Sequence, residues 1–299
     1  MADRLPNLLA IQGMTRAQVE SLLDRAASLE AGAEPPRSLS GKVVANLFFE
    51  DSTRTRSSFE IAAKRLGAEV LNWTTRGSSV SKGETLLDTV RNIDAMGPHA
   101  IVMRHSSSGA AALAARAARA VMINAGDGTH EHPSQALLDA FTLKRHLGPL
   151  EGKRILIVGD ILHSRVARSN LRCLTLLGAR VTFCGPPTLV PGEFAAEGAE
   201  ISFDLDRALE GADAVMMLRV QLERQTDALF PTAREYARRW GLTQARAERL
   251  PPGVKVLHPG PMNRNVEIAT QVADGPRSLI LEQVRHGVAV RMAVLEACA

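Results

Sequence analysis

The stretch VVANLFFEDSTRTRSSFEIAAKRL, residues 43–66, decides the fold. Its apolar beginning, residues 43–49, has the composition of a strand, and its end, residues 58–66, has the composition of a helix. The polar segment 52–56 therefore lies where a strand leads into a helix N-terminus. Unpaired backbone N–H groups and the positive end of the helix dipole favour a bound anion there, and the two arginines and three hydroxyls of the segment add donors. These residues predict a phosphate site.

A plainer interpretation of the same segment is that Ser52 or Thr53 only caps the helix, while Arg54 and Arg56 are solvated. Both interpretations start a helix here, and they differ in whether an anion binds to it. The chain contains no G-x-x-x-x-G-K-[ST] sequence, which argues against a nucleotide site of the Walker type.

Outward from this stretch, strand-like and helix-like segments alternate along most of the chain. We expect further strands at residues 68–73, 100–104, 121–124, 154–158, 180–184, 214–218 and 254–257. We expect helices at residues 15–31, 85–96, 109–120, 133–147, 164–177, 232–240, 245–250 and 278–298. Such alternation is typical of an α/β fold, in which a parallel sheet carries helices on both faces.

The segment GPLEG, residues 148–152, interrupts this alternation and is the best candidate for a linker. We therefore expect two doubly wound domains, each a parallel sheet flanked by helices. The first spans residues 1–147 and is completed by a C-terminal helix at 278–299 that returns to it, and the second spans residues 148–277. The strand-like ILIVGD at 155–160 lacks a G-x-G-x-x-G sequence, so a dinucleotide site is not expected.

The composition is that of a globular protein, with 45% hydrophobic and 23% charged residues. No apolar stretch approaches the roughly 20 residues of a membrane span, and the N-terminus lacks a signal-peptide pattern, so a cytoplasmic location is the default expectation. The formal net charge is +4 with Lys and Arg scattered, which favours neither nucleic acid nor a membrane as partner. Cys173, Cys184 and Cys298 form no C-x-x-C pair and are expected to be reduced thiols in or near cores.

Polar residues follow the other expected strands of the first half. Arg104 ends one strand, and open α/β sheets bind ligands beyond the carboxyl ends of their strands. Further along, Pro133 is well placed to start a helix, which puts His132 and Gln135 about one helical turn apart and able to face one ligand. His130 and His132 also suggest a metal site, but the P-C-x-x-C partner found in zinc deaminases is absent, so no metal is expected.

The second half carries two segments with arginines beyond expected strands, HSRVARS at 163–169 and RVQLER at 219–224. Two guanidinium groups in one domain suit bidentate binding of carboxylates. Two further polar segments are SSVSKGET at 78–85, a flexible loop ahead of a helix, and HPGPMNR at 258–264, a rigid turn. Each of the four, taken alone, is also consistent with an ordinary surface loop.

Taken in order, these motifs resemble those of the aspartate/ornithine carbamoyltransferase family over nearly the whole chain. They are S-T-R-T-R-x-S-F-E, K-G-E-T, H-P-S-Q, H-S-R-V-A-R-S, R-x-Q-x-E-R and H-P-G-P. The resemblance implies that carbamoyl phosphate is bound by Ser52, Thr53, Arg54, Thr55, Arg104, His132, Gln135, Gly260 and Pro261. Within that set, His132 donates to the carbamoyl carbonyl oxygen and Gln135 holds the amide nitrogen. The family often has Leu or Ala where this chain has Gly260, but the contacts there come from the backbone.

The K-G-E-T and R-x-Q-x-E-R motifs match the aspartate-specific branch of the family. This match implies that L-aspartate is bound by Lys82, Arg165, Arg219, Gln221 and Pro259. In that branch the loop that carries Ser78 and Lys82 reaches the active site of a neighbouring subunit, so the resemblance implies a homotrimer. The implied catalytic residues are Arg54, Thr55, Lys82, Arg104 and His132. Whether regulatory or dihydroorotase-type subunits join the trimer is left open by the sequence.

The implied reaction moves the carbamoyl group from carbamoyl phosphate to the amine of L-aspartate by direct attack, a step of pyrimidine biosynthesis that needs no covalent nucleophile, metal or cofactor. Two alternatives differ from it. An ornithine-specific enzyme typically carries S-M-G and H-C-L-P motifs, and this chain has neither. A catalytically inactive homologue that serves as an assembly subunit is the second, and the presence of every expected catalytic residue argues against it.

Overall fold

The chain forms two compact units, each built on its own parallel sheet. The computed structural model describes residues 5–32, 36–74, 83–220 and 232–299. The first unit consists of Met1–Phe141 and Val284–Ala299, and the second of Thr142–Gln283. The chain thus leaves the first unit within the helix α5 (Pro133–Leu147) and comes back to it within α11 (Ile280–Cys298). Among the described helices, none has the length and apolar character needed to cross a bilayer.

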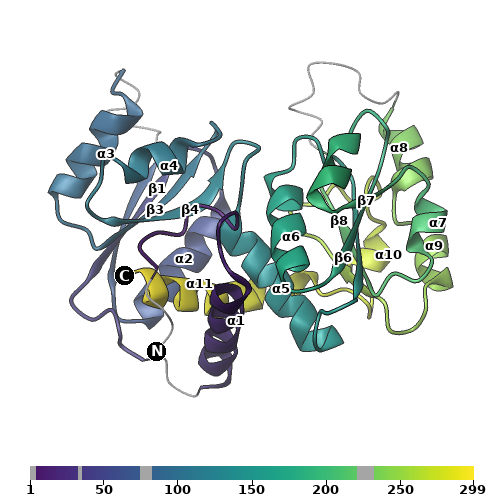
Figure 1. Cartoon of the computed structure of the whole chain (residues 1–299), viewed down its shortest axis with the longest axis horizontal. Helices are drawn as coiled ribbons and strands as arrows, with labels where there is room; N and C mark the ends of the chain where they lie inside the picture. The colour runs from purple at the N-terminus through teal and green to yellow at the C-terminus, as the bar shows by residue number, and fades with distance from the viewer. Residues whose placement is uncertain (1–4, 33–35, 75–82, 221–231) are drawn as a thin grey trace. The chain divides into compact units, whose positions relative to one another are not determined.

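The sheet of the first unit has the strand order β2-β1-β3-β4, and all its strands are parallel. The strands are β1 (Val43–Phe48), β2 (Glu69–Thr74), β3 (Ala100–His105) and β4 (Val121–Asp127). Around this sheet lie α5, α11 and four further helices: α1 (Arg16–Ala31), α2 (Thr53–Arg65), α3 (Leu86–Ala95) and α4 (Ala110–Ala115). Helices α3 and α4 pack on one face of the sheet, and α2 and α11 lie on the other (Figure 1). Apolar side chains at alternate strand positions fill both interfaces.

The N-terminal segment extends this sheet beyond β4. Leu8 forms a parallel bridge with Ile123: its N–H donates to Met122 O at 3.0 Å, and its carbonyl accepts from Asn124 N at 2.8 Å. The Asn124 side chain adds a bond from Nδ2 to Leu9 O at 2.8 Å. The backbone groups on the outer side of β4, the last strand of the sheet, are therefore paired with the chain's own N-terminal segment.

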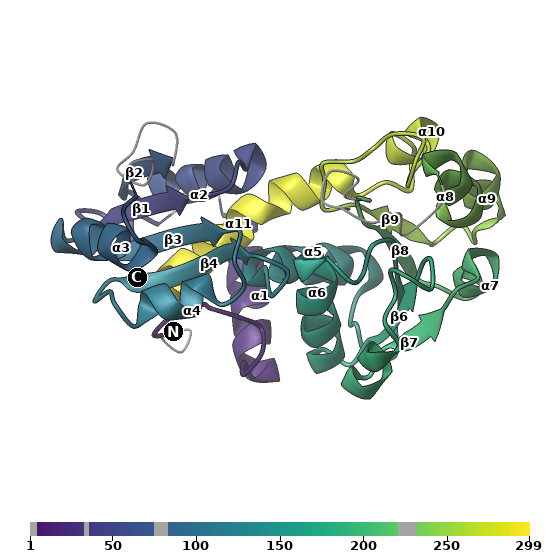
Figure 2. The ribbon, with the colours of Figure 1, turned by 90° about the horizontal axis from the view of Figure 1, so that it is seen from above.

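The sheet of the second unit has the strand order β7-β6-β5-β8-β9 and is parallel as well. Its strands are β5 (Arg154–Val158), β6 (Arg180–Cys184), β7 (Glu200–Ser202), β8 (Ala214–Met217) and β9 (Lys255–Leu257). Its helices are α6 (Arg165–Leu176), the 3-10 helix η2 (Gly192–Glu197), α7 (Leu205–Leu209), α8 (Ala233–Trp240), α9 (Gln244–Arg249) and α10 (Thr270–Ala273). Figure 2 shows helices on both sides of these strands.

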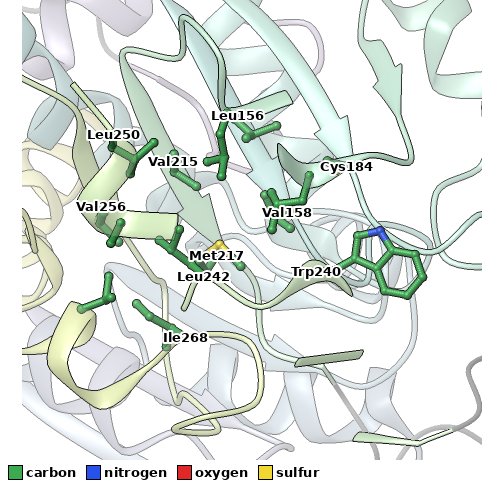
Figure 3. Packing of buried hydrophobic residues seen from close by; sticks show 14 of the residues in the cluster. Leu156, Val158, Cys184, Val215, Met217, Trp240, Leu242, Leu250, Val256 and Ile268 are labelled. Atoms are coloured by element: carbon green, nitrogen blue, oxygen red, sulfur yellow. The ribbon is translucent and has the colours of Figure 1, made fainter. Parts of the chain in front are cut away.

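One apolar cluster holds the second unit together. Side chains from β5, β8 and β9 pack with residues from α8 and from the segments around α9 and α10 (Figure 3). The labelled members are Leu156, Val158, Cys184, Val215, Met217, Trp240, Leu242, Leu250, Val256 and Ile268. Full burial of each large apolar side chain contributes about 1.5–3 kcal/mol to folding. All three cysteines of the chain are buried and form no disulfide, as the sequence predicts.

The predicted fold class is confirmed, and most predicted elements lie within a residue or two of the observed ones. The helix predicted for residues 109–120 is wrong at its end, because α4 stops at Ala115. The carboxylate of Asp94 accepts from the N–H groups of Arg119 and Ala120 at 2.9 and 2.8 Å. These N–H groups are therefore not available for the backbone hydrogen bonds of a longer helix. The elements β7, η2, α7 and α10 were not predicted, because segments of three to six residues carry little periodicity.

The Asp94 contact predicts a pH-dependent contribution to stability. Burial raises the pKa of the Asp94 carboxyl, but hydrogen bonds from Ala120 and Arg119 outweigh burial and leave the pKa below its ordinary value. Such a group stabilises the fold above the unfolded pKa of about 3.9, and this stabilisation is lost as the pH falls through the folded pKa. Asp94→Asn should lower the free energy of unfolding at pH 7 by about 1–3 kcal/mol, and the deficit should persist to about pH 4 and shrink below it.

Asp88→Asn on the same helix is the matched control, because the Asp88 side chain is exposed and exposed ion pairs contribute little. Thermal unfolding of the three proteins between pH 3 and pH 7 makes the comparison. A deficit that grew as the pH fell, or an equal deficit in both variants, would contradict the assigned role of Asp94.

Candidate functional site

The segment between β1 and α2 is an uncapped helix start. Ser52 occupies the N-cap position, but among the described residues its side chain makes no capping hydrogen bond, and only its carbonyl accepts from Arg56 N at 3.2 Å. Of the plainer interpretation, capping by the Ser52 side chain is therefore not what the structure has, whereas Arg54 is exposed as that interpretation expects. The positive end of the helix dipole favours an anion at this start of α2.

The first turn of α2 is anchored from within the helix. Ser58 Oγ donates to the carbonyl oxygens of Arg54 and Thr55 at 2.7 and 3.0 Å, and the Thr55 side chain is buried. Thr53 and Arg54 are exposed. The turn therefore combines a fixed backbone with a guanidinium that faces solvent, as an anion site needs.

Arg104 lies beside this segment, on the neighbouring strand β3. Phe48 pairs with Arg104 in the sheet, and Phe49 N donates to Arg104 O at 2.9 Å. The Arg104 Nε lies 3.2 Å from Glu50 Oε2, and Nη1 donates to Ala125 O at 3.4 Å. The guanidinium is thus held at the carboxyl ends of β1, β3 and β4, where the sequence predicts it.

The turn after β4 is organised by two buried carboxylates that sequence reasoning did not identify. Asp127 accepts from Asn124 Nδ2 at 2.8 Å, from Glu131 N at 3.1 Å and from Gly109 N at 2.7 Å. Glu131 accepts from the backbone N–H groups of Ile11 and Gln12 at 2.8 and 3.1 Å. Both groups satisfy backbone donors that the loops leave unpaired, a role that needs partners far away in the sequence.

Gly128 in this turn is required by space as well as by backbone conformation. Its φ is +48°, and a Cβ there would lie 2.4 Å from Ser108 N. Any other residue would push the turn away from the loop after β3.

His132 and Gln135 stand at the start of α5, which begins at Pro133 as predicted. The His132 carbonyl accepts from Gln135 N at 3.0 Å, and both side chains are buried. Gln135 Nε2 donates to Asp139 Oδ1 at 2.9 Å. Because the strands are parallel, the segments after β1, β3 and β4 lie at one edge of the sheet, and this edge therefore gathers the predicted ligands of the first unit.

In the second unit, Arg165 is the first residue of α6, directly after the turn that follows β5. Ser164 caps the helix, with its Oγ accepting from Ala167 N at 3.1 Å, and the Arg165 side chain is buried. His163 Nδ1 lies 2.9 Å from Asp160 Oδ1, which fixes the turn. Arg168 differs from Arg165: it lies 5.2 Å over the Phe194 ring, and burial lowers its pKa.

Arg219 follows β8, which pairs with β5 through Val158 and Met217. The next residue, Val220, is held by a bond from Asn263 Nδ2 to its carbonyl at 3.0 Å. Arg165 and Arg219 thus follow neighbouring parallel strands, which end at the same edge of the second sheet. Gln221, Lys82 and Ser78, which the sequence also predicts as site residues, lie outside the described residues.

The Pro-Gly-Pro turn is supported by His258, a second feature that sequence reasoning missed. Gly260 N donates to His258 Nδ1 at 2.8 Å, so the other ring nitrogen, Nε2, carries the hydrogen and donates to Glu267 Oε1 at 3.2 Å. Both side chains are fully buried. Gly260 has a φ of +61°, in the left-handed region where glycine is unstrained, and its bond to Pro261 is cis.

Within the described ranges, no group of three or more His, Cys, Asp or Glu side chains is placed to hold a metal ion. The chemistry that the described residues offer is binding and polarisation. One edge in the first unit carries donors of a kind that suits a phosphate and a carbonyl, and one edge in the second carries two arginines, whose guanidinium groups suit carboxylates.

Comparison with known proteins gives matches over almost the entire chain. Residues 6–145 match the carbamoyl-P binding domain of aspartate/ornithine carbamoyltransferase, and residues 151–298 match its Asp/Orn binding domain. The aspartate carbamoyltransferase catalytic subunit of Myxococcus xanthus is 66% identical over 293 residues, which cover 98% of this chain and 99% of that protein. The corresponding subunit of Acidothermus cellulolyticus is 56% identical over 97% of this chain and 91% of that protein.

Solved structures give the same result. Aspartate transcarbamoylase from Trypanosoma cruzi in complex with carbamoyl phosphate and aspartate superposes with a TM-score of 0.88 at 32% identity, covering 97% of this chain and 96% of that one. The catalytic subunit of M. jannaschii aspartate transcarbamoylase superposes with a TM-score of 0.86 at 34% identity, with 98% of both chains covered. With both domains matched and a relative at 66% identity, this chain belongs to the aspartate/ornithine carbamoyltransferase family.

Proposed function

We propose that this chain is an aspartate carbamoyltransferase, which transfers the carbamoyl group of carbamoyl phosphate to L-aspartate and gives N-carbamoyl-L-aspartate and phosphate. The observation that carries the proposal is the pair of arginines, Arg165 and Arg219, that follow neighbouring strands in the unit matching the Asp/Orn binding domain. Two guanidinium groups suit the two carboxylates of aspartate and would repel the cationic side chain of ornithine. The relatives named as aspartate carbamoyltransferase catalytic subunits support this choice.

Carbamoyl phosphate belongs to the first unit in this proposal. The uncapped start of α2, with Ser52, Thr53, Arg54 and Thr55, takes the phosphate. Arg104 and His132, together with Thr55, stabilise the negative charge that grows on the carbonyl oxygen. Donors of this kind, fixed in place before the reaction, contribute several kcal/mol to transition-state stabilisation.

The reaction is a direct displacement at the carbonyl carbon. The neutral amine of aspartate forms the new C–N bond, and the C–O bond to phosphate breaks with its electron pair leaving on the phosphate oxygen. The proton that the amine loses ends on the departing phosphate. The charge moves from the carbonyl oxygen to the departing phosphate, where Arg54 and Lys82 offset it. Since the carbon never bonds to the enzyme, the reaction proceeds without a covalent intermediate.

Aspartate is held by Arg165, Arg219 and Gln221, and the backbone carbonyls of the Pro259 to Pro261 turn accept from the amines of both substrates. Lys82 is supplied by a neighbouring subunit in a homotrimer. The cytoplasmic location, the trimer and the site shared between subunits rest on the family resemblance and stay predictions.

The proposed activity is tested by a colorimetric assay for the ureido product with aspartate or ornithine as acceptor. We expect product with aspartate and none with ornithine, because the arginines select a dicarboxylate. Product from ornithine alone, or from neither amino acid, would contradict the proposal.

Removal of the exposed guanidinium at the phosphate site should abolish most of this activity. Arg54→Ala is expected to lower kcat/KM by about 100-fold or more, the typical cost of losing a donor to the transition state. Arg65→Ala, at the opposite end of the same helix and also exposed, is the matched control and should change kcat/KM less than about twofold. Equal losses in the two variants would show that charge on α2 in general, not Arg54, matters.

The shared site is tested by mixing two inactive variants. Each proposed site combines Arg54 of one chain with Lys82 of a neighbouring chain. A trimer that contains both Arg54→Ala and Lys82→Ala chains therefore has one site in which both residues are intact. Random exchange between equal amounts should therefore restore roughly a quarter of wild-type activity. No recovery, with subunit exchange shown independently by a mass label, would count against a site built from two subunits.

A further inference from the structure

Gln135 is bonded through its amide nitrogen to a buried carboxylate. Its Nε2 donates to Asp139 Oδ1 at 2.9 Å, across one turn of α5. Asp139 is fully buried and Gln135 nearly so, with 0% and 7% of their surfaces exposed. The family resemblance implies that Gln135 holds the amide nitrogen of the carbamoyl group, and it assigns no role to Asp139.

The carboxylate decides which way the Gln135 amide faces. The oxygen and nitrogen of an amide have nearly the same shape, so packing alone leaves two orientations open. An ionised carboxylate only accepts hydrogen bonds, and Nε2 is the donor end of the amide. Asp139 therefore fixes Nε2 on its own side and leaves Oε1, the acceptor, on the opposite side of the Cγ–Cδ bond, facing away from Asp139.

A buried cation accompanies this buried carboxylate. Arg291 on α11 is 4% exposed, and its guanidinium lies 5.1 Å over the ring of Phe59 on α2. Burial lowers the pKa of Arg291 to about 10, and the negative charge of Asp139 opposes that change. Arg291 thus remains charged at neutral pH, and the core of the first unit holds one positive and one negative group that interact.

Helix α11 is shaped to admit this cation. Gly287 lies one turn before Arg291, and a Cβ at Gly287 would be 2.5 Å from Arg291 Nη1 and 3.3 Å from Leu138 Cδ2. The glycine therefore makes room for the guanidinium. Figure 2 shows α11 running beside α2 and α5, the two helices that begin at the proposed phosphate and carbamoyl ligands, and the ring contact between Phe141 and His286 joins α5 to α11.

We propose that Asp139 is a positioning residue that turns the acceptor oxygen of Gln135 toward the NH₂ of the carbamoyl group. The inference rests on the proposed function and deepens it. It explains how the site distinguishes a carbamoyl group from an acyl group of the same shape, since a methyl group in place of NH₂ has no hydrogen to give to Oε1.

Equilibrium binding of carbamoyl phosphate and acetyl phosphate to wild type and to Asp139→Asn tests the inference, without need of turnover. The asparagine can donate as well as accept, so the Gln135 amide loses its preferred orientation. We expect affinity for carbamoyl phosphate to fall about tenfold and affinity for acetyl phosphate to change less than about twofold. Equal weakening of both ligands would show a structural role and overturn the inference, and so would no change in either.

A double-mutant cycle with Gln135→Ala separates a role through Gln135 from any other. In the Gln135→Ala background, Asp139→Asn should produce no further loss of carbamoyl phosphate affinity, because the group that it orients is gone. An additional tenfold loss in that background would contradict the assignment.

Loss of the Asp139 charge leaves Arg291 without its counter-charge, so Asp139→Asn alone can fail to fold. The double variant Asp139→Asn with Arg291→Met removes both charges at similar volume and should fold, with the same loss of preference for carbamoyl over acetyl phosphate. A preserved preference in the folded double variant would overturn the inference. A wild-type protein that prefers carbamoyl phosphate but makes no product from aspartate would instead count against the proposed function alone.

Discussion

Parallel strand pairing is the constraint on which the arrangement of the functional residues depends. In each of the two sheets every strand runs the same way, so all strands of a sheet end at one edge. The polar segments after β1, β3 and β4 are gathered by this constraint in the first unit, and those after β5 and β8 in the second. A single antiparallel strand would have sent its following loop, and the side chains on it, to the opposite edge.

Buried side chains then fix the loops that parallel pairing has gathered. Asp127 and Glu131 satisfy backbone donors around the turn before α5, and Asp139 does the same for a side-chain amide. In the second unit the pair of His258 and Glu267 holds the Pro-Gly-Pro turn. Each group accepts hydrogen bonds that water would otherwise make, which is why these charged or polar side chains are stable in a core.

The sequence predicts which segments the parallel strands gather, but it does not predict the buried side chains that fix the loops. Strands, helix starts and the arginines beyond strand ends depend on local composition, and residues such as Arg104, Pro133 and Arg165 lie where the patterns place them. The early end of α4 and the bridge of Leu8 to β4 depend on partners far along the chain, which local periodicity does not contain. The same holds for the buried Arg291, which looks like an ordinary polar position of a C-terminal helix until α2 and α5 are packed against it.

The central claim is that the first unit binds the phosphate of carbamoyl phosphate and that the second binds the two carboxylates of L-aspartate, the substrate that reacts with it. One ligand carries two carboxylates together with a phosphonate in place of the phosphate: N-(phosphonacetyl)-L-aspartic acid, which is bound in a solved aspartate transcarbamoylase of Trypanosoma cruzi. Calorimetric titration of this compound into wild type, Arg54→Ala and Arg165→Ala is the most direct measurement. The account predicts tight binding to wild type and a loss of about 100-fold in each variant. Wild-type affinity in either variant would contradict it.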